Sequence, residues 1–279
     1  MQKSYDNRAT LYLVPTPIGN LQDITERALS ILSFVDFILC EDTRVSYPLL
    51  RHYNISKRLV SCHEFNEDKI KDFVLNELNN DKNIALITDQ GSPIISDPGY
   101  LLCKYIIQNG YNVVGLPGAT AFVPALISSG INANHFLYYG FLNIKSSKQK
   151  NELESLKKFP YTLIFYEAPH RIIKTLSNML EVFGDRYVSI SREISKVHEE
   201  IVRGPISSCL KEMKVIKGEY VLVVSGCEKE SYYDLSILSH IKLYLSDGMD
   251  EMQAIKRVAK ERGVAKSIIY KEYLEEKEK

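Results

Sequence analysis

The sequence predicts an α/β protein with two α/β domains and a small helical C-terminal extension. Over the first 120 residues, short and continuously apolar segments alternate with amphipathic helical ones, a pattern typical of a mainly parallel sheet covered on both faces. In the second domain, Tyr and Phe alternate at the starts of several strand-like segments, which favours a mixed sheet. We therefore expect domains at 1–120, 121–230 and 231–279.

In the first domain each expected strand is a short apolar run, and each expected helix has apolar residues at helical spacing. Asp23 and Glu26 have the spacing of a capping box at the start of the first helix, and Gly110 closes the third. The expected strands are 11–15, 36–40, 58–62, 84–88 and 111–116, and the expected helices are 23–34, 68–80 and 100–110.

The second domain begins after a helix that is expected at 119–130 and that ends at Gly130. The tail, residues 249–276, has the pattern of two short helices separated by Gly263, with Ser267 as N-cap of the second. We interpret this pair as a helical bracket, because nine basic residues against eight acidic ones from Lys242 onward give no basic face. The expected strands of the second domain are 135–141, 161–168, 186–193 and 219–226.

Composition excludes several protein classes. Lys+Arg and Asp+Glu both number 35, so the protein has no net positive charge that would attract nucleic acid. Any nucleic acid would have to bind a local basic patch. No apolar run is long enough to span a bilayer, and no signal peptide opens the chain, so no membrane partner is expected. Five cysteines without a C-x-x-C pair argue against disulfides and a zinc site, and they indicate a reducing cytoplasm.

The familiar nucleotide and hydrolase motifs are absent: there is no G-x-G-x-x-G, no Walker A loop and no G-x-S-x-G elbow. Instead, four irregular loops follow predicted strands, at 15–23, 41–44, 88–99 and 116–121. The carboxyl ends of the strands form the edge of an open α/β sheet at which ligands bind. Gly and Pro in these loops keep them rigid and leave backbone N–H and C=O groups exposed. Each loop alone is an ordinary βα turn, but four at one edge predict a site.

The second domain offers charged segments beyond its own predicted strands, at 166–171, 191–196 and 217–222. Glu167 or Glu193 is a candidate for taking a proton or orienting an arginine. Each such residue is more often part of a structural ion pair than a catalytic group. The candidate phosphate contacts are His170, Arg171, Arg192 and Lys196.

Six segments in the same order resemble the tetrapyrrole methylase family, in its branch that acts on ribosomal RNA. They are "LYLVPTPIGNLQDITERAL", "EDTR", "SPIISDPGY", "LPGATA", "LIFYEAPHR" and "SREISKVHEE". The resemblance runs from about residue 11 to 226 and extends to the tail. It implies a homodimer that binds S-adenosylmethionine between two α/β domains. It also implies methylation of the ribose 2′-hydroxyl of a cytidine in 16S rRNA, near the decoding site of the small ribosomal subunit.

Carried over by position, the resemblance implies a donor site made largely of backbone. This sequence departs from the family at Gln90, where the family usually has alanine, and a larger side chain must be accommodated there. The implied donor-binding residues are Pro17, Ile18, Gly19, Asp89, Gly91, Ser92, Thr120, Ala121, Tyr166, Gly218 and Glu219.

A ribose hydroxyl is a poor nucleophile until its proton is leaving, so a base or a nearby cation should assist. We hypothesise that either Glu41, Asp42 and Arg44, or Glu167 with Arg192, supply this help, and the sequence does not rank them.

Phosphate contacts are expected from lysines in 143–159, a stretch with five lysines against two glutamates. Lys145, Lys148 and Lys150 belong to it, and the same pattern also fits a solvated helix face. The alternatives to an rRNA methyltransferase are an enzyme that methylates a porphyrinoid and a non-catalytic RNA-binding protein.

Overall fold

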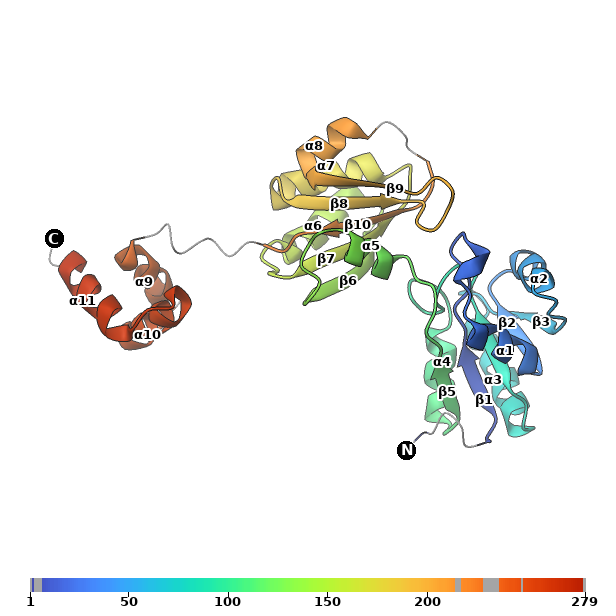
Figure 1. The fold of residues 1–279 in the computed structure, drawn as a ribbon. Helices are drawn as coiled ribbons and strands as arrows, with labels where there is room; N and C mark the ends of the chain where they lie inside the picture. Colours follow the sequence, from blue (N-terminus) through green and yellow to red (C-terminus); the bar gives the residue numbers. More distant parts are fainter. Residues whose placement is uncertain (1, 3–6, 214–216, 228–235, 247, 278–279) are drawn as a thin grey trace. The chain divides into compact units, whose positions relative to one another are not determined.

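The computed structural model describes residues 2, 7–213, 217–227, 236–246 and 248–277 (Figure 1). By its internal contacts the chain divides into two units, residues 1–226 and 227–279. The first unit contains two separate five-stranded sheets. The boundary expected at 230/231 lies outside the described residues, and the one near residue 120 stays a prediction.

The first sheet is parallel throughout, with strand order β3-β2-β4-β1-β5. Its inner strands β2 and β4 are buried along their whole length, as a parallel sheet covered on both faces requires. The strands are β1 (Thr10–Leu13), β2 (Phe37–Cys40), β3 (Arg58–Ser61), β4 (Ile84–Ile87) and β5 (Asn112–Gly115).

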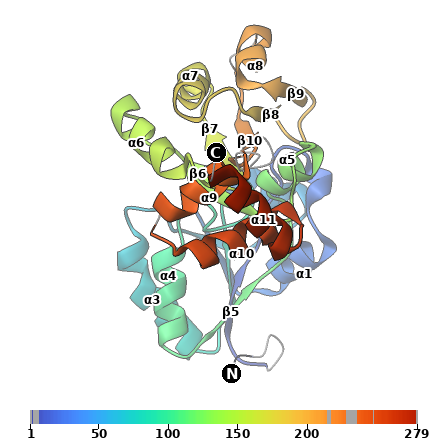
Figure 2. The ribbon, with the colours of Figure 1, turned by 90° about the vertical axis from the view of Figure 1, so that its left-hand side faces the viewer.

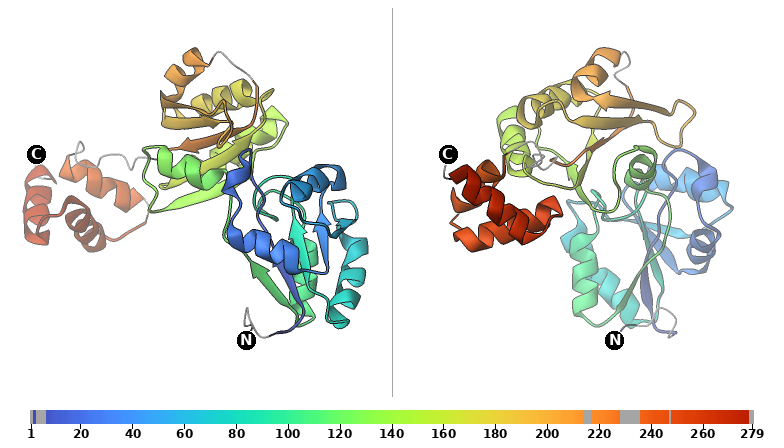
Figure 3. Two further views of the ribbon diagram at one scale, coloured as in Figure 1. Left: turned by 45° about the vertical axis from the view of Figure 1, so that its right-hand side comes forward. Right: turned by 60° about the vertical axis from the view of Figure 1, so that its left-hand side comes forward.

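Two hydrophobic clusters lie on opposite faces of this sheet. α1 and α2 contribute to one and α3 and α4 to the other, and Figure 3 shows these helices around the sheet. The elements are η1 (Leu21–Asp23), α1 (Glu26–Phe34), α2 (Thr43–His52), α3 (Glu67–Asn79) and α4 (Tyr100–Gln108).

Two details of these helices differ from the sequence prediction. The capping box of Asp23 and Glu26 is wrong, because Thr25 is the N-cap of α1 and its hydroxyl accepts the N–H of Ala28 at 3.0 Å. Helix α2 was not expected, since Pro48 lies inside it. Its N-cap is Asp42, which accepts the N–H of Arg44 at 2.8 Å.

The second sheet is mixed, as predicted, with strand order β6-β7-β10-β8-β9. β6 and β7 are parallel and the other neighbours are antiparallel. Strand β9 and helices α7 and α8 were not expected, and α6 was expected only as the alternative interpretation of the lysine stretch. The elements are β6 (Phe136–Phe141), β7 (Thr162–Glu167), β8 (Tyr187–Arg192), β9 (Glu200–Pro205), β10 (Tyr220–Val224), α5 (Phe122–Ser128), α6 (Ser146–Leu156), α7 (Ile172–Phe183) and α8 (Ile206–Glu212).

One face of this sheet packs against α6, α7 and α8 around Phe165, and the other packs against α5. Because β6 and β7 are parallel, their carboxyl ends share one edge of the sheet. The segments after these two strands, together with the loop before β10, form that edge.

The described residues of the second unit form three helices with their own core, built around Ile241, Ile255 and Ile269. The first of the three, Ile237–Ser246, was not expected and adds to the predicted pair. Gly263 ends α10 in the left-handed conformation, with φ of 64°. Ser267 as N-cap is wrong, because α11 already begins at Lys266. The helices, drawn in red in Figure 2, are α9 (Ile237–Ser246), α10 (Glu251–Arg262) and α11 (Lys266–Lys277). In the described part of the chain, no helix combines the length and apolar character that a membrane crossing needs.

Candidate functional site

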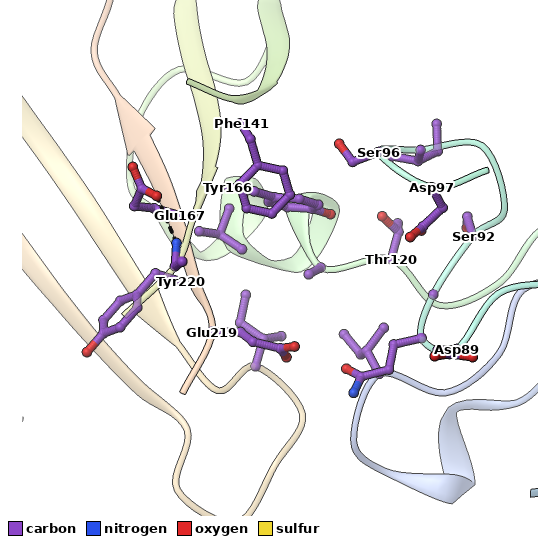
Figure 4. A pocket seen from close by; sticks show the side chains of 18 of the residues that line it. Asp89, Ser92, Ser96, Asp97, Thr120, Phe141, Tyr166, Glu167, Glu219 and Tyr220 are labelled. Carbon is purple, nitrogen blue, oxygen red and sulfur yellow. Dashed lines mark hydrogen bonds between the residues drawn. The ribbon is translucent and has the colours of Figure 1, made fainter. Parts of the chain in front are cut away.

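The candidate site is a cavity of about 530 Å³ in the first unit, within the ~300–1,000 Å³ range of ligand pockets. One side is formed by loops that follow β1, β2 and β4, together with the segment that leads into α5. The other side comes from β6, β7 and β10 and from the segment after β8. Figure 4 shows Ser92, Asp97 and Thr120 on one side and Phe141, Tyr166 and Glu219 on the other.

Gly91 holds two of these loops together. Its N–H donates to the carbonyl of Thr16 at 3.0 Å, and its carbonyl accepts the N–H of Thr16 at 2.8 Å, which forms an isolated antiparallel bridge. The φ of Gly91 is +84°, a conformation in which a side chain is disfavoured. The bridge fixes the loop after β4 against the loop after β1.

The rest of the loop after β4 is strained. Ile94 and Ser96 have φ of 74° and 66°, which is rare for a non-glycine residue and most unusual for a β-branched one. Ser96 is tied to the second sheet, because its Oγ lies 2.7 Å from the hydroxyl of Tyr138. Strain of this kind persists where surrounding structure enforces it, and it concentrates at functional sites.

The cavity is acidic. Among the described residues that line it, none is Lys, Arg or His. Arg171 and Lys196, outside the lining, pair with Glu167 and Glu219, so the uncompensated negative charge comes from Glu41, Asp89 and Asp97. Because charges of one sign in a cleft raise the local concentration of the opposite charge, this cavity favours a cationic ligand over a phosphate. The acidic residues are Glu41, Asp89, Asp97, Glu167 and Glu219.

Three of these carboxylates come from the first domain. Burial raises the pKa of Asp97 to about 6, and the nearby charge of Glu41 adds to the effect. Burial also raises the pKa of Asp89, although its Oδ1 accepts the N–H of Asp42 at 3.2 Å. Glu41 Oε2 accepts the hydroxyl hydrogen of Thr88 at 3.0 Å.

Glu167 is bound within a structural network. It is 2% exposed, and it accepts hydrogen bonds from the hydroxyl of Thr175 at 2.5 Å and the N–H of Ala168 at 2.8 Å. Arg171 Nε lies 3.1 Å from its Oε1, and Arg171 also donates to the carbonyl of Leu142 at 2.6 Å. These bonds tie the end of β7 to α7 and to the segment after β6.

The structure brings ten of the expected site residues together. Gln90 also lines the cavity, and it is exposed, so its larger side chain is not packed in the core. The ten are Ile18, Glu41, Asp89, Gly91, Ser92, Thr120, Ala121, Tyr166, Glu167 and Glu219.

Three expected donor-binding residues do not line this cavity. The Cα of Gly19 packs so closely on the side chain of Lys196 that an added Cβ would lie 2.3 Å from Lys196 Cγ. Gly218, with φ of +85°, is packed similarly against Glu193. The third is Pro17.

The expected cations lie outside the cavity lining. Most form ion pairs: Arg44 with Asp42 at 2.6 Å, Arg192 with Glu200 at 3.0 Å, and Lys150 with Glu181 at 2.5 Å. Lys196 bridges Glu193 at 2.9 Å and Glu219 at 2.8 Å. Lys145, Lys148 and His170 are exposed.

Asp97 and Phe141 are among the residues of the site that sequence reasoning did not name individually. Asp97 stands in a loop that the sequence had singled out, and its place in a D-P-G turn was the available signal. Phe141 is the last residue of β6 and is 52% exposed, and an exposed aromatic residue cannot be recognised from strand periodicity.

The model of the family described as Tetrapyrrole (Corrin/Porphyrin) Methylases matches residues 10–209. Ribosomal RNA small subunit methyltransferase I from Bacillus subtilis (strain 168) is 45% identical over 272 residues, which cover 94% of this chain and 93% of the relative. The protein of the same name from Escherichia coli O157:H7 is 40% identical over 281 residues, covering 99% and 98%.

Solved structures show the same fold at low identity. Uroporphyrin-III-C-methyltransferase from Thermus thermophilus superposes with a TM-score of 0.56 at 19% identity, covering 78% of this chain and 94% of that one. Diphthine synthase gives 0.62 at 12% identity, covering 78% and 90%. With a family model that spans most of the chain and relatives that match it nearly end to end, this chain belongs to the tetrapyrrole (corrin/porphyrin) methylases.

Proposed function

We propose that the protein transfers a methyl group from S-adenosylmethionine to the RNA of the small ribosomal subunit. The observation that carries this is the 40–45% identity, over almost the full chain, to proteins named ribosomal RNA small subunit methyltransferase I. The finer proposal is a ribose 2′-hydroxyl of a cytidine in 16S rRNA near the decoding site, with the protein acting as a cytoplasmic homodimer.

Chain length distinguishes this function from porphyrinoid methylation. The match to uroporphyrin-III-C-methyltransferase covers 94% of that chain but 78% of this one, which leaves about a fifth of this chain unmatched. The proteins named for ribosomal RNA cover up to 99% of it. A chain segment shared with the RNA enzymes and not needed for a small acceptor supports an RNA substrate.

The cavity fits S-adenosylmethionine, which supplies a methyl group on a positively charged sulfonium. Asp89 and Glu219 place carboxylates on opposite sides of a space that is otherwise lined in part by apolar residues such as Ile18 and Val221. Carboxylates attract the cationic donor more strongly than the demethylated product, which has lost the sulfonium charge. The acidic lining therefore favours donor binding and product release together.

The proton that leaves the acceptor hydroxyl can be received by a carboxylate that lines the cavity. Of the catalytic candidates from the sequence, Glu41 and Glu167 line the cavity, whereas Asp42, Arg44 and Arg192 do not. Glu167 already accepts several hydrogen bonds. We therefore assign proton removal to Glu41 and Asp97, and a group whose pKa lies near neutrality is well suited to that step.

Transfer of labelled methyl groups from S-adenosylmethionine tests the proposal. Isolated 30S subunits, naked 16S rRNA and a porphyrinoid serve as parallel acceptors, and the label is expected in RNA. Alkaline hydrolysis then distinguishes the position, because a 2′-O-methyl group blocks cleavage at its own nucleotide. Labelling of the porphyrinoid alone, or of no RNA, would overturn the proposal. Sedimentation of the purified chain tests the homodimer.

A further inference from the structure

A second hollow lies beside the cavity, between α2 and the edge strand β3. This groove measures about 550 Å³ and is more open than the cavity. Figures 1 and 3 show α2 next to β3, so the groove runs along the edge of the first sheet. It is lined by Thr43, Arg44, Tyr47, Pro48, Lys57 and Leu59.

The groove belongs to a basic part of the chain. Residues 43–63 contain four Arg or Lys and no Asp or Glu, and two of these cations, Arg44 and Lys57, line the groove, whereas no acidic residue does. Lys57 forms no ion pair with any residue that the structure describes. The Arg44 side chain is 88% exposed, and Asp42 holds its guanidinium in place through Nε and Nη2.

The groove also offers an aromatic surface. Tyr47, on the first turns of α2, is 59% exposed, and it lines the groove together with Lys57. Exposed aromatic rings next to cations are the usual means of binding single-stranded RNA, because bases stack on the ring while the cations contact phosphates.

One segment of chain connects the groove to the cavity. Glu41 lines the cavity, and Thr43 and Arg44 line the groove. Between them the N–H of Asp42 donates to Asp89, another residue of the cavity wall. Because the cavity is acidic, it repels an RNA backbone, and phosphates near the reacting nucleotide must be held on an adjacent surface. The groove is such a surface.

We propose that the groove binds a single-stranded segment of the RNA acceptor adjacent to the nucleotide that enters the cavity. Lys57 and Arg44 contact its phosphates, and Tyr47 stacks on one of its bases. This assignment rests on the proposed function and adds a place where the acceptor is held. It differs from the expected role of the α6 lysines, because it assigns the phosphate contacts next to the reacting nucleotide to the groove between α2 and β3.

Steady-state methyl transfer to naked 16S rRNA and to 30S subunits, combined with calorimetric titration of S-adenosylmethionine, tests the groove. Tyr47→Ala is expected to raise KM for RNA about tenfold, the effect of losing one stacked base, and Tyr47→Phe should retain wild-type KM. Lys57→Ala should raise KM several-fold and lower the slope of log affinity against log salt by about one.

Donor affinity, and kcat at saturating RNA, should remain unchanged in all three groove variants. Lys104→Ala, at an exposed position on α4, is the matched control, and Lys148→Ala tests the competing surface on α6. If the wild type methylates RNA while Tyr47→Ala and Lys57→Ala keep its KM and salt slope, the groove assignment is wrong and the proposed function stands. A wild type that methylates no RNA overturns both.

Discussion

Ser96 and Tyr138 connect the two sides of the cavity, with Ser96 Oγ 2.7 Å from the Tyr138 hydroxyl. Ser96 lies in the strained loop after β4, and Tyr138 lies on β6 of the other sheet. Burial raises the pKa of Tyr138, so its phenol stays neutral and keeps its hydrogen. One hydrogen bond thus helps to hold the loop that carries Asp97 in its place.

A double-mutant cycle on this pair should reveal coupling. Tyr138→Phe and Ser96→Ala are each expected to lower the free energy of unfolding by about 0.5–1.5 kcal/mol, the usual contribution of one hydrogen bond. The double variant should lose less than the sum. Urea unfolding of the four proteins measures the coupling, and strictly additive losses would show that the bond contributes nothing.

Substitution of Gly91 should weaken both the fold and donor binding. At φ of +84°, Gly91→Ala places a Cβ 3.3 Å from Ile18 Cγ2, and the left-handed conformation costs a non-glycine residue about 1–2 kcal/mol. Thermal unfolding and calorimetric titration of S-adenosylmethionine measure the two losses. Gly110→Ala is the control, because it has φ of +81° with nothing within 4 Å of the added Cβ. Equal donor affinity in the two variants would contradict the role given to the bridge with Thr16.

Most of the site was recognisable from the sequence because loops at strand ends are local features. Of the residues that line the cavity, only Phe141 falls outside the segments singled out by Gly, Pro and charge. Those segments also included Gly19 and Gly218, whose packing against Lys196 and Glu193 depends on distant parts of the chain. Sequence spacing identifies a loop, whereas the side of the loop that faces a ligand is set by tertiary packing.

The sheets followed from apolar periodicity, and two of the elements that were missed, α2 and β9, had conflicting local signals. Helix α2 contains Pro48, which usually ends a helix, yet the helix continues because Leu50 is buried in the core. Strand β9 is only partly buried at the edge of its sheet and lacks a continuous apolar run. Tertiary contacts outweigh weak propensity in both cases.

Replacement of Asp97 by Asn should stabilise the folded protein at neutral pH. The folded-state pKa of Asp97 is raised from 3.8 to about 6, so the folded state holds an extra proton between these values. The free energy of unfolding contributed by Asp97 is therefore lost as pH rises from about 4 to 6, and above that range the loss is complete. Since Asp97 is only partly buried, the gain in Asp97→Asn at pH 7.5 should be about 1 kcal/mol.

Urea unfolding across pH 3.5–7.5 measures this gain, which should vanish at the acidic end. Asp81→Asn is the control at an exposed position with φ of 58°, which asparagine tolerates. A wild type and an Asp97→Asn variant with parallel pH profiles would show that Asp97 titrates normally.

Donor affinity should rise with pH through about 6, because ionised Asp97 attracts the cationic donor and protonated Asp97 does not. Calorimetric titration of S-adenosylmethionine at pH 5.0 and 7.5 is expected to show tighter binding at the higher pH. The demethylated product, without the sulfonium charge, should show a smaller change. In Asp97→Asn the difference between the two pH values should shrink, and an unaltered difference would assign the effect to another group.

Glu167 should prove structural and not the proton acceptor, although it lines the cavity. Glu167→Ala leaves the Arg171 guanidinium, which is 15% exposed, without its carboxylate partner, and breaking such a buried pair costs about 3–5 kcal/mol. Glu167→Gln keeps an acceptor for Thr175 and should lose less stability. If Glu167 were the base, Glu167→Gln would reduce kcat by about 10²–10⁴-fold. We expect kcat per folded molecule to fall less than tenfold in Glu167→Gln and far more in Glu41→Gln, as single-turnover methyl transfer at a temperature where all variants are folded will measure.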